Sequence, residues 1–163
     1  MNKLDAIINQ AERQCKVHGT RLTDKRKQVL AGLLKSGKAL SAYELVDFCK
    51  KEFSETIPAM TVYRILDFLE EENLAHKLKI ANKYVACSHI PCDHNHQPQF
   101  LICTRCQKVE EISIDFSIIQ ALEKNVKQAG FQVVNSKLEM DCVCDECKEA
   151  AIKPANIRCK LKV

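Results

Sequence analysis

Apolar residues in the first 75 positions recur at intervals of three and four, which is the period of an amphipathic helix. Signals for helix ends divide this segment into four. Thr23 suits the N-cap of the second helix and Gly37 its end, while Ser41, with a glutamate three residues later, forms a capping box that opens the third. Pro58 suits the first turn of the fourth helix, because proline lacks the N–H group that is unpaired there anyway. We therefore predict four helices, the last over residues 58–73.

The period changes to two after Asn73, which indicates β-strands. Residues 74–80 and 83–87 alternate apolar and polar side chains on either side of Ala81-Asn82. Two short alternating runs joined by such a turn predict a β-hairpin. Three or four helices followed by a hairpin predict a winged helix.

Residues 88–98 lose all periodicity and contain two prolines, which predicts a hinge. Beyond the hinge the pattern predicts a strand, a turn, a strand, a helix and a long strand, at residues 99–103, 104–108, 109–114, 115–130 and 131–140. No pattern is visible from about Lys148 onward. The part of the chain between the hinge and Lys148 has few apolar side chains and therefore a thin core. We expect it to need a metal ion or a partner subunit for stability.

The chain contains ten cysteines and no apolar run that approaches the roughly 18–20 residues needed to span a bilayer. Residues 1–15 mix acids into a helical pattern and lack the apolar segment of a signal peptide. We therefore expect a cytoplasmic protein, in which thiols stay reduced and bind metal rather than forming disulfides.

Two CxxC motifs, Cys103 to Cys106 and Cys144 to Cys147, carry the strongest metal signal. The spacing lets both sulfur atoms of a tight turn face one ion, and two such turns complete a tetrahedral tetrathiolate, which suits zinc. Because protein ligands fill all four positions, we predict a structural site. A thioredoxin-like redox pair is the alternative. Cys142 could replace Cys144, although the CxxC spacing favours Cys144.

A second group of possible ligands comes from both sides of the predicted hinge. It comprises His76, Cys87, His89, Cys92, His94, His96, Glu110 and Glu111. Such a Cys/His/Glu set favours zinc over iron, because thiolates are soft ligands. An ion shared by the two sides would favour one domain orientation and could act as a switch. The alternative is a histidine-rich loop that is only solvated surface.

Charge is unevenly distributed along the chain. Residues 1–38 carry nine Lys/Arg against three Asp/Glu, a net charge of +6, although the whole chain has only +4. A basic leading segment favours a polyanionic partner. A solvated helical surface is the alternative explanation.

Several motifs together resemble the ferric uptake regulator family of bacterial metal-sensing repressors. They are RLTDKRKQVL, SAYELVDF, TVYRILDFLEEENLAHK, YVAC and the paired CxxC motifs. Iron-sensing members usually carry a His-His-Asp-His run before the first CxxC, and peroxide sensors share that pattern. Here the position reads HNHQPQFLIC, so the chain is most similar to the zinc-sensing branch.

The resemblance implies an α+β fold, a homodimer and four segments. These are a winged-helix DNA-binding domain (1–87), a hinge (88–98), a small α/β dimerisation domain with a four-cysteine zinc site (99–150) and a tail (151–163). It also implies one structural and one regulatory zinc ion per chain. The structural ligands would be Cys103, Cys106, Cys144 and Cys147, and the regulatory ligands His76, Cys87, His96 and Glu111. His89, Cys92 and His94 are possible extra ligands.

The helix that contains TVYR resembles the family's recognition helix. Arg64 can donate two hydrogen bonds to guanine, and Thr61 and Tyr63 can reach phosphate or a thymine methyl group. Tyr43 resembles a residue that contacts DNA in relatives. Lys25, Arg26 and Lys27 lie where phosphate contacts would position the domain. A core position is the alternative for Tyr63.

These features predict a zinc-responsive repressor that binds operator DNA as a dimer when zinc-loaded and controls zinc uptake genes. An iron- or other-metal-sensing member of the same family is the alternative. A zinc-dependent hydrolase fits less well, because the chain has no HExxH motif and only four glycines to form a substrate-binding loop. A thiol redox or metal-storage protein would not need a winged helix. We therefore expect no enzymatic activity, no small-molecule substrate and no membrane partner.

Overall fold

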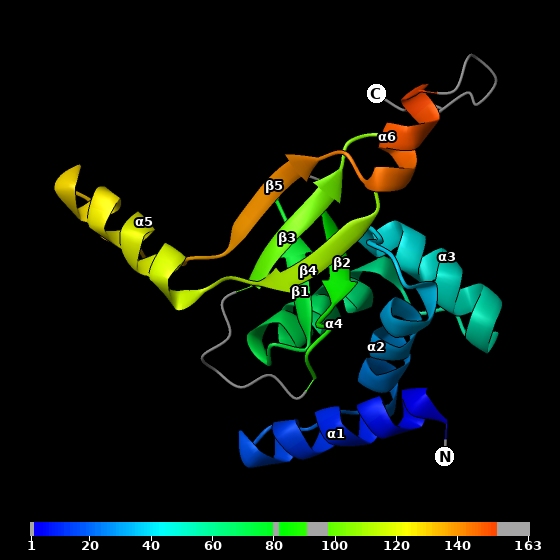
Figure 1. The fold of residues 1–163 in the computed structure, drawn as a ribbon. Helices are drawn as coiled ribbons and strands as arrows, with labels where there is room; N and C mark the ends of the chain where they lie inside the picture. The colour runs from blue at the N-terminus through cyan, green and yellow to red at the C-terminus, as the bar shows by residue number, and fades with distance from the viewer. Residues whose placement is uncertain (1, 80–81, 91–97, 153–163) are drawn as a thin grey trace. The chain divides into compact units, whose positions relative to one another are not determined.

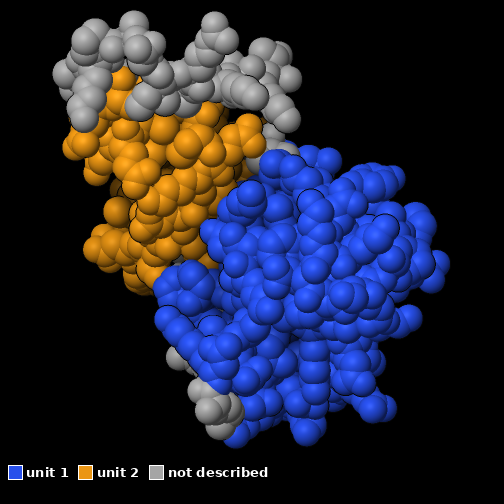
Figure 2. All heavy atoms as spheres, turned by 90° about the vertical axis from the view of Figure 1, so that its right-hand side faces the viewer, with its two compact units in different colours: residues 1–94 blue, residues 95–163 orange. Residues whose placement is uncertain are grey.

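The computed structural model describes residues 2–79, 82–90 and 98–152, except for the side chains of 151 and 152. The chain forms two compact units, residues 1–94 and 95–163, which are coloured separately in Figure 2. The predicted turn residue Ala81, the possible ligands Cys92, His94 and His96, and the tail from residue 153 lie outside the described residues. Each unit is described here by itself.

The first unit contains four helices and a hairpin, as predicted (Figure 1). The helices are α1 (Lys3–Val17), α2 (Asp24–Ser36), α3 (Ala42–Phe53) and α4 (Ala59–Glu71). Strands β1 (Ala75–Leu78) and β2 (Lys83–Ala86) pair antiparallel, and Leu40 joins β2 through two backbone hydrogen bonds with Tyr84. The apolar faces meet in one core that includes Val29, Leu30, Leu45, Val62, Leu66, Leu69 and Leu74. The winged helix and the α+β class are confirmed.

The helix ends follow the sequence signals with one difference. The Ser41 hydroxyl accepts from the Glu44 N–H at 3.2 Å, and the Glu44 carboxylate accepts from the Ser41 N–H at 2.8 Å, so the capping box is formed. The Ser41 N–H, which donates to the charged form, lowers the pKa of Glu44. Gly37 ends α2 in the left-handed region at φ 61°. Pro58 is the N-cap of α4 rather than part of its first turn, because its ψ of 143° is extended.

The buried carboxylate of Glu72, at the end of α4, contacts residues that directly follow α1. Glu72, 6% exposed, accepts a hydrogen bond from the Thr20 hydroxyl at 2.9 Å and lies 2.7 Å from Nδ1 of His18. The Glu72 backbone carbonyl accepts from the Gln14 amide at 2.7 Å. Buried charged groups are stable only when they are hydrogen-bonded. The contacts of Glu72 therefore hold the C-terminal end of α4 in place.

The second unit is built around a three-stranded sheet. Strands β3 (Pro98–Cys103), β4 (Val109–Ser113) and β5 (Leu138–Cys142) lie in the order β4-β3-β5, with β4 antiparallel and β5 parallel to β3. Helix α5 (Phe116–Gln128) connects β4 to β5, and helix α6 (Asp145–Ile152) follows. The register places Cys103 opposite Cys142. Figure 1 shows α5 projecting from the end of the sheet rather than covering it.

Two predictions for the second unit were wrong. The long strand at 131–140 is only β5, from Leu138 to Cys142, because the Asn135 side chain accepts the Lys137 N–H at 2.9 Å in a local turn. Residues 148–152, the described part of the segment expected to lack a pattern, belong to α6. Among the described residues, every helix is too short or too polar to cross a membrane.

The second unit buries few side chains of its own. Its buried apolar residues, within the described ranges, are Phe100, Ile102, Cys103, Ile119 and Cys147. On α5, Ile119 is buried, but Ile118 and Leu122 on the same face are 53% and 39% exposed. This unit is therefore as thinly packed as its sequence predicts.

We expect Glu72→Ala to lower the free energy of unfolding by about 2 kcal/mol, because it removes a buried charged acceptor and leaves its donors unpaired. Urea denaturation followed by far-UV circular dichroism measures the change. The exposed neighbour Glu71 is the matched control, and Glu71→Ala should be nearly neutral. Equal stabilities of the two variants would contradict the role given to Glu72.

Candidate metal centre and nucleic-acid interface

The second unit brings the four cysteines of the CxxC motifs together. The sulfur atoms of Cys103, Cys106, Cys144 and Cys147 all lie within 4.8 Å of one another. The Sγ atoms of Cys106 and Cys144 are 3.6 Å apart. In a tetrahedral zinc site with Zn–S bonds of about 2.3 Å, neighbouring sulfur atoms are about 3.8 Å apart. The spacing of the sulfur atoms therefore fits a single zinc ion.

Backbone hydrogen bonds shape both cysteine turns. The Gln107 N–H donates to the Cys103 carbonyl at 2.9 Å, and Gln107 adopts a left-handed conformation with φ 62°. Cys144 immediately precedes α6 and Cys147 lies in its first turn. The second motif is thus positioned by the beginning of a helix, which sequence reasoning missed. The acids Asp145 and Glu146 between the two cysteines are the helix-start signal that could have revealed it.

The thiols of Cys103 and Cys147 differ in pKa. Burial raises the pKa of Cys103, but N–H groups of Cys106, Cys144 and Arg105 outweigh burial and lower that pKa to about 6. The neighbouring Cys144 thiol, followed by burial, raises the pKa of Cys147. The Cys147 thiol therefore resists loss of its proton. A divalent cation removes this obstacle, because a thiol that coordinates zinc is deprotonated.

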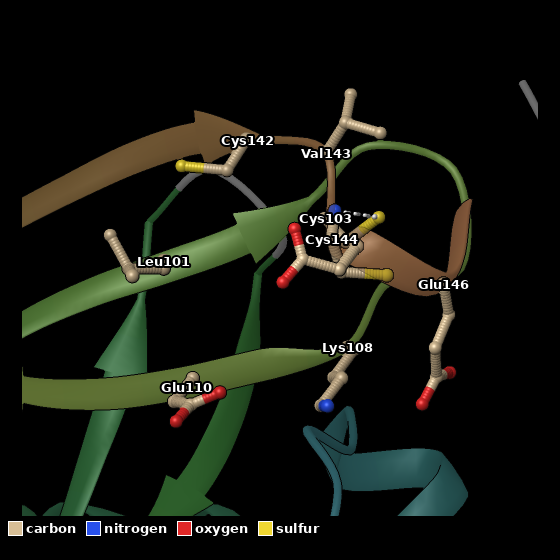
Figure 3. A pocket seen from close by; sticks show the side chains of 9 residues that line it. Leu101, Cys103, Lys108, Glu110, Cys142, Val143, Cys144 and Glu146 are labelled. Atoms are coloured by element: carbon tan, nitrogen blue, oxygen red, sulfur yellow. Dashed lines mark hydrogen bonds between the residues drawn. The ribbon is translucent and has the colours of Figure 1, made fainter. Parts of the chain in front are cut away.

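Cys142 does not belong to this cluster. Figure 3 shows its sulfur atom turned away from those of Cys103 and Cys144. Its side chain lines an open hollow of about 340 Å³ that Cys103, Cys144, Lys108 and Glu110 also line. Of the two candidates for the second motif's first ligand, Cys144 is therefore the one whose sulfur atom reaches the cluster.

The predicted regulatory ligands are only partly described. His76 on β1 and the buried Cys87 after β2 belong to the hairpin of the first unit, and their ligand atoms lie within 4.8 Å of each other. The Cys87 N–H donates to the Leu74 carbonyl at 2.9 Å, which holds it beside β1. Glu111 is half-buried on β4 of the second unit, opposite Phe100. His89 is exposed, and His96 lies outside the described residues.

Helix α4 presents the predicted DNA-reading side chains. Val62, Ile65, Leu66 and Leu69 form its buried face. Arg64 is exposed, and Thr61 is half-buried. The first turn of α4 contains no acidic residue, so its positive dipole end is not neutralised. These features suit an approach of this helix to a polyanion.

Tyr63 is neither fully exposed nor a core residue. It is half-buried, packs partly against the core and contacts the ring of Tyr43 edge-on, with centroids 6.2 Å apart. Tyr43 itself is 66% exposed. The two rings therefore form one aromatic surface between α3 and α4.

The basic residues at the start of α2 have different environments. The Arg26 guanidinium stacks 3.6 Å from the centre of the Phe68 ring and donates to the Arg21 carbonyl at 2.6 Å. Lys27 forms a 3.2 Å ion pair with Glu12. Lys25 is exposed. Of the three, Arg26 and Lys27 therefore also contribute to packing between the helices.

A model of the ferric uptake regulator family matches residues 17–141. The chain belongs to the ferric uptake regulator family. It is 32% identical to the zinc uptake regulation protein of Escherichia coli (strain K12) over 143 residues, which are 88% of this chain and 82% of that protein. It is 28% identical to the ferric uptake regulation protein of Helicobacter pylori (strain ATCC 700392 / 26695) over 153 residues, which are 92% and 97% of the two chains.

Solved structures of regulators from this family resemble the chain closely. A zinc uptake regulator complexed with zinc and DNA has a TM-score of 0.83 and 29% identity, covering 94% of this chain and 100% of that one. The crystal structure of holo XcZur has a TM-score of 0.76 and 36% identity, covering 89% and 99%. The similarity therefore extends over both units of this family member.

We expect Cys144→Ser to abolish binding of one Co²⁺ or Zn²⁺ equivalent, because it removes one of four clustered thiolates. Cys142→Ser should bind metal like the parent, since its sulfur atom points elsewhere. Metal analysis after dialysis, together with the sulfur-to-cobalt charge-transfer absorbance, distinguishes the two variants. Loss of metal from Cys142→Ser but not from Cys144→Ser would reverse the assignment.

Proposed function

We propose that this family member is a zinc-responsive transcriptional repressor that binds operator DNA as a dimer when zinc-loaded and controls zinc uptake genes. The observation that carries this proposal is its similarity, over 94% of its length, to a zinc uptake regulator in complex with zinc and DNA. The protein acts in the cytoplasm by binding rather than by catalysis. The four cysteines fill every coordination position of the structural zinc ion, so this ion has no open position for a hydrolytic reaction.

The structural ligands in this proposal are Cys103, Cys106, Cys144 and Cys147. They would hold one zinc ion between the end of β3 and the start of α6 in the dimerisation domain, residues 99–150. Bound zinc supplies a cross-link between two distant parts of a thinly packed unit. Its binding free energy adds directly to the stability of the folded state.

The regulatory ligands in this proposal are His76, Cys87, His96 and Glu111. The proximity of His76 and Cys87 on one hairpin supports the first half of this set. A thiolate among the ligands favours zinc over iron, which argues against the iron-sensing alternative. Because the four ligands come from both sides of the hinge at residues 88–98, sharing one ion restricts how the two DNA-binding domains of a dimer are oriented. His89, Cys92 and His94 remain candidates for additional ligands.

Operator recognition in this proposal belongs to α4 and its surroundings. Arg64 reads a guanine edge in the major groove, while Tyr43, Thr61 and Tyr63 contact backbone or bases nearby. Lys25, Arg26 and Lys27 at the start of α2 contact phosphate and position the domain, residues 1–87. A dimer presents two such helices to successive half-sites, which requires a restricted domain orientation.

The dimer in this proposal forms through the second unit. Ile118 and Leu122 are exposed on the apolar face of α5, and Phe116 at its start is 70% exposed. Exposed apolar side chains in a thinly packed unit indicate a surface that a partner covers. A second copy of the chain would bury this face.

We expect His96→Ala to leave a folded dimer that binds operator DNA weakly at every zinc concentration. Cys103→Ser should instead lose folding or dimerisation, because its ligand is structural. Fluorescence anisotropy with labelled operator, measured against buffered free zinc, separates the two effects. Operator binding by His96→Ala that is as tight and as zinc-dependent as that of the parent would remove His96 from the switch.

We expect Leu122→Glu to shift the protein from dimer to monomer at micromolar concentration, because a charge on the apolar face of α5 cannot be buried at low cost. Size-exclusion chromatography with light scattering measures the mass. Lys124→Glu, on the opposite side of α5, is the control and should remain dimeric. A dimeric Leu122→Glu would exclude this face as the dimer surface.

A further inference from the structure

Met60 is a strongly exposed apolar residue at the start of α4. It lies in the first turn of α4 and is 67% exposed although it is apolar. An α-helix advances about 100° per residue, so Met60 lies almost opposite the centre of the buried face. The exposed stripe through it consists of Met60, Arg64, Asp67 and Glu71. Nothing in the core of this unit requires an apolar side chain at this position.

Charge along α4 decides which half of that stripe can approach DNA. Arg64 is the only cationic residue of the helix, and the acids Asp67, Glu70 and Glu71 all lie after it. Phosphate repels the acidic half and attracts the half that contains the positive dipole end. Recognition helices also contact bases with their N-terminal residues. Met60 therefore belongs to the half of α4 that enters the groove.

We propose that Met60 is a specificity-determining residue that contacts the C5-methyl group of a thymine in the major groove. This inference rests on the proposed function and adds a base contact that is absent from the predicted set. A thymine methyl is the apolar group that the major groove offers, and the flexible thioether side chain of methionine adapts to such a surface. Met60 and Arg64 are about 6 Å apart along the helix axis, which corresponds to roughly two base steps. The thymine therefore lies within about two base pairs of the guanine that Arg64 contacts.

The test uses duplexes that the zinc-loaded, full-length parent selects from a random-sequence pool. Each thymine of a selected duplex is replaced in turn by deoxyuridine, which removes only the methyl group. We expect one replacement near the Arg64 guanine to weaken parent binding about fourfold per half-site, the effect of one lost buried methyl group. The guanine is located by the position at which Arg64→Ala loses base discrimination.

Met60→Ala supplies the second half of the test. Its side chain is exposed and alanine favours helix, so the variant should fold like the parent. It should bind the thymine duplex about as weakly as the parent binds the deoxyuridine duplex, and it should not distinguish the two. Val17→Ala, at an apolar residue that is 83% exposed at the end of α1, is the control and should behave like the parent.

The outcomes separate this inference from the proposed function. Selection of no duplex by folded, zinc-loaded parent would overturn both. Selection followed by no effect of any thymine replacement would overturn the Met60 contact and leave the repressor function intact. The contact would also be overturned if Met60→Ala still preferred the thymine duplex over the deoxyuridine duplex by the same factor as the parent.

Discussion

The sulfur atoms of Cys103, Cys106, Cys144 and Cys147 join the end of β3 to the start of α6, across the whole strand, helix and strand of residues 107–143. This unit buries only a few apolar side chains of its own, so its packing alone stabilises it weakly. Zinc bound by the four thiolates would cross-link the end of β3 to the start of α6. This cross-link would restrict the unfolded chain and hold β5 beside β3. The exposed face of α5 and the position of Glu111 on β4 depend on this sheet. In the proposed function, dimer formation and metal sensing would therefore both depend on the clustered cysteines.

The first unit differs from the second because it has an extensive core. Its proposed role requires α4 to be held in a fixed position relative to DNA. The buried face of α4 fixes its rotation, and Glu72 fixes its end against α1 through Thr20 and His18. The position of α4 matters because a small displacement of a side chain is enough to break its hydrogen bond or contact with a base. The acids in the C-terminal half of α4 repel phosphate, which supports the proposal that the half with Met60 and Arg64 approaches DNA.

The proposed zinc switch depends on the two units being stabilised independently of each other. In this proposal, the first unit binds DNA and the second unit forms the dimer. Each unit supplies only some of the regulatory zinc ligands, so zinc binding couples the orientations of the two units. The pairing of β1 and β2 holds His76 and Cys87 close together. Two of the four proposed regulatory ligands are therefore already positioned before metal binds. The free energy that a shared ion contributes to one orientation is then the free energy by which DNA binding responds to zinc.

Local sequence signals were sufficient for the helices of the first unit, the capping box at Ser41, the hairpin and the two CxxC motifs, because each depends on residues a few positions apart. The predicted ligands of the cysteine cluster were likewise readable from spacing. The CxxC spacing already favoured Cys144 over Cys142, and the structure agrees. The turn at Asn135 that delays β5 and the start of α6 between Cys144 and Cys147 are local features that sequence reasoning missed. Only the tertiary structure decided that Arg26 stacks on Phe68 and that Tyr63 is half-buried against Tyr43. Both contacts join residues far apart in the chain, and short-range periodicity carries no information about such partners.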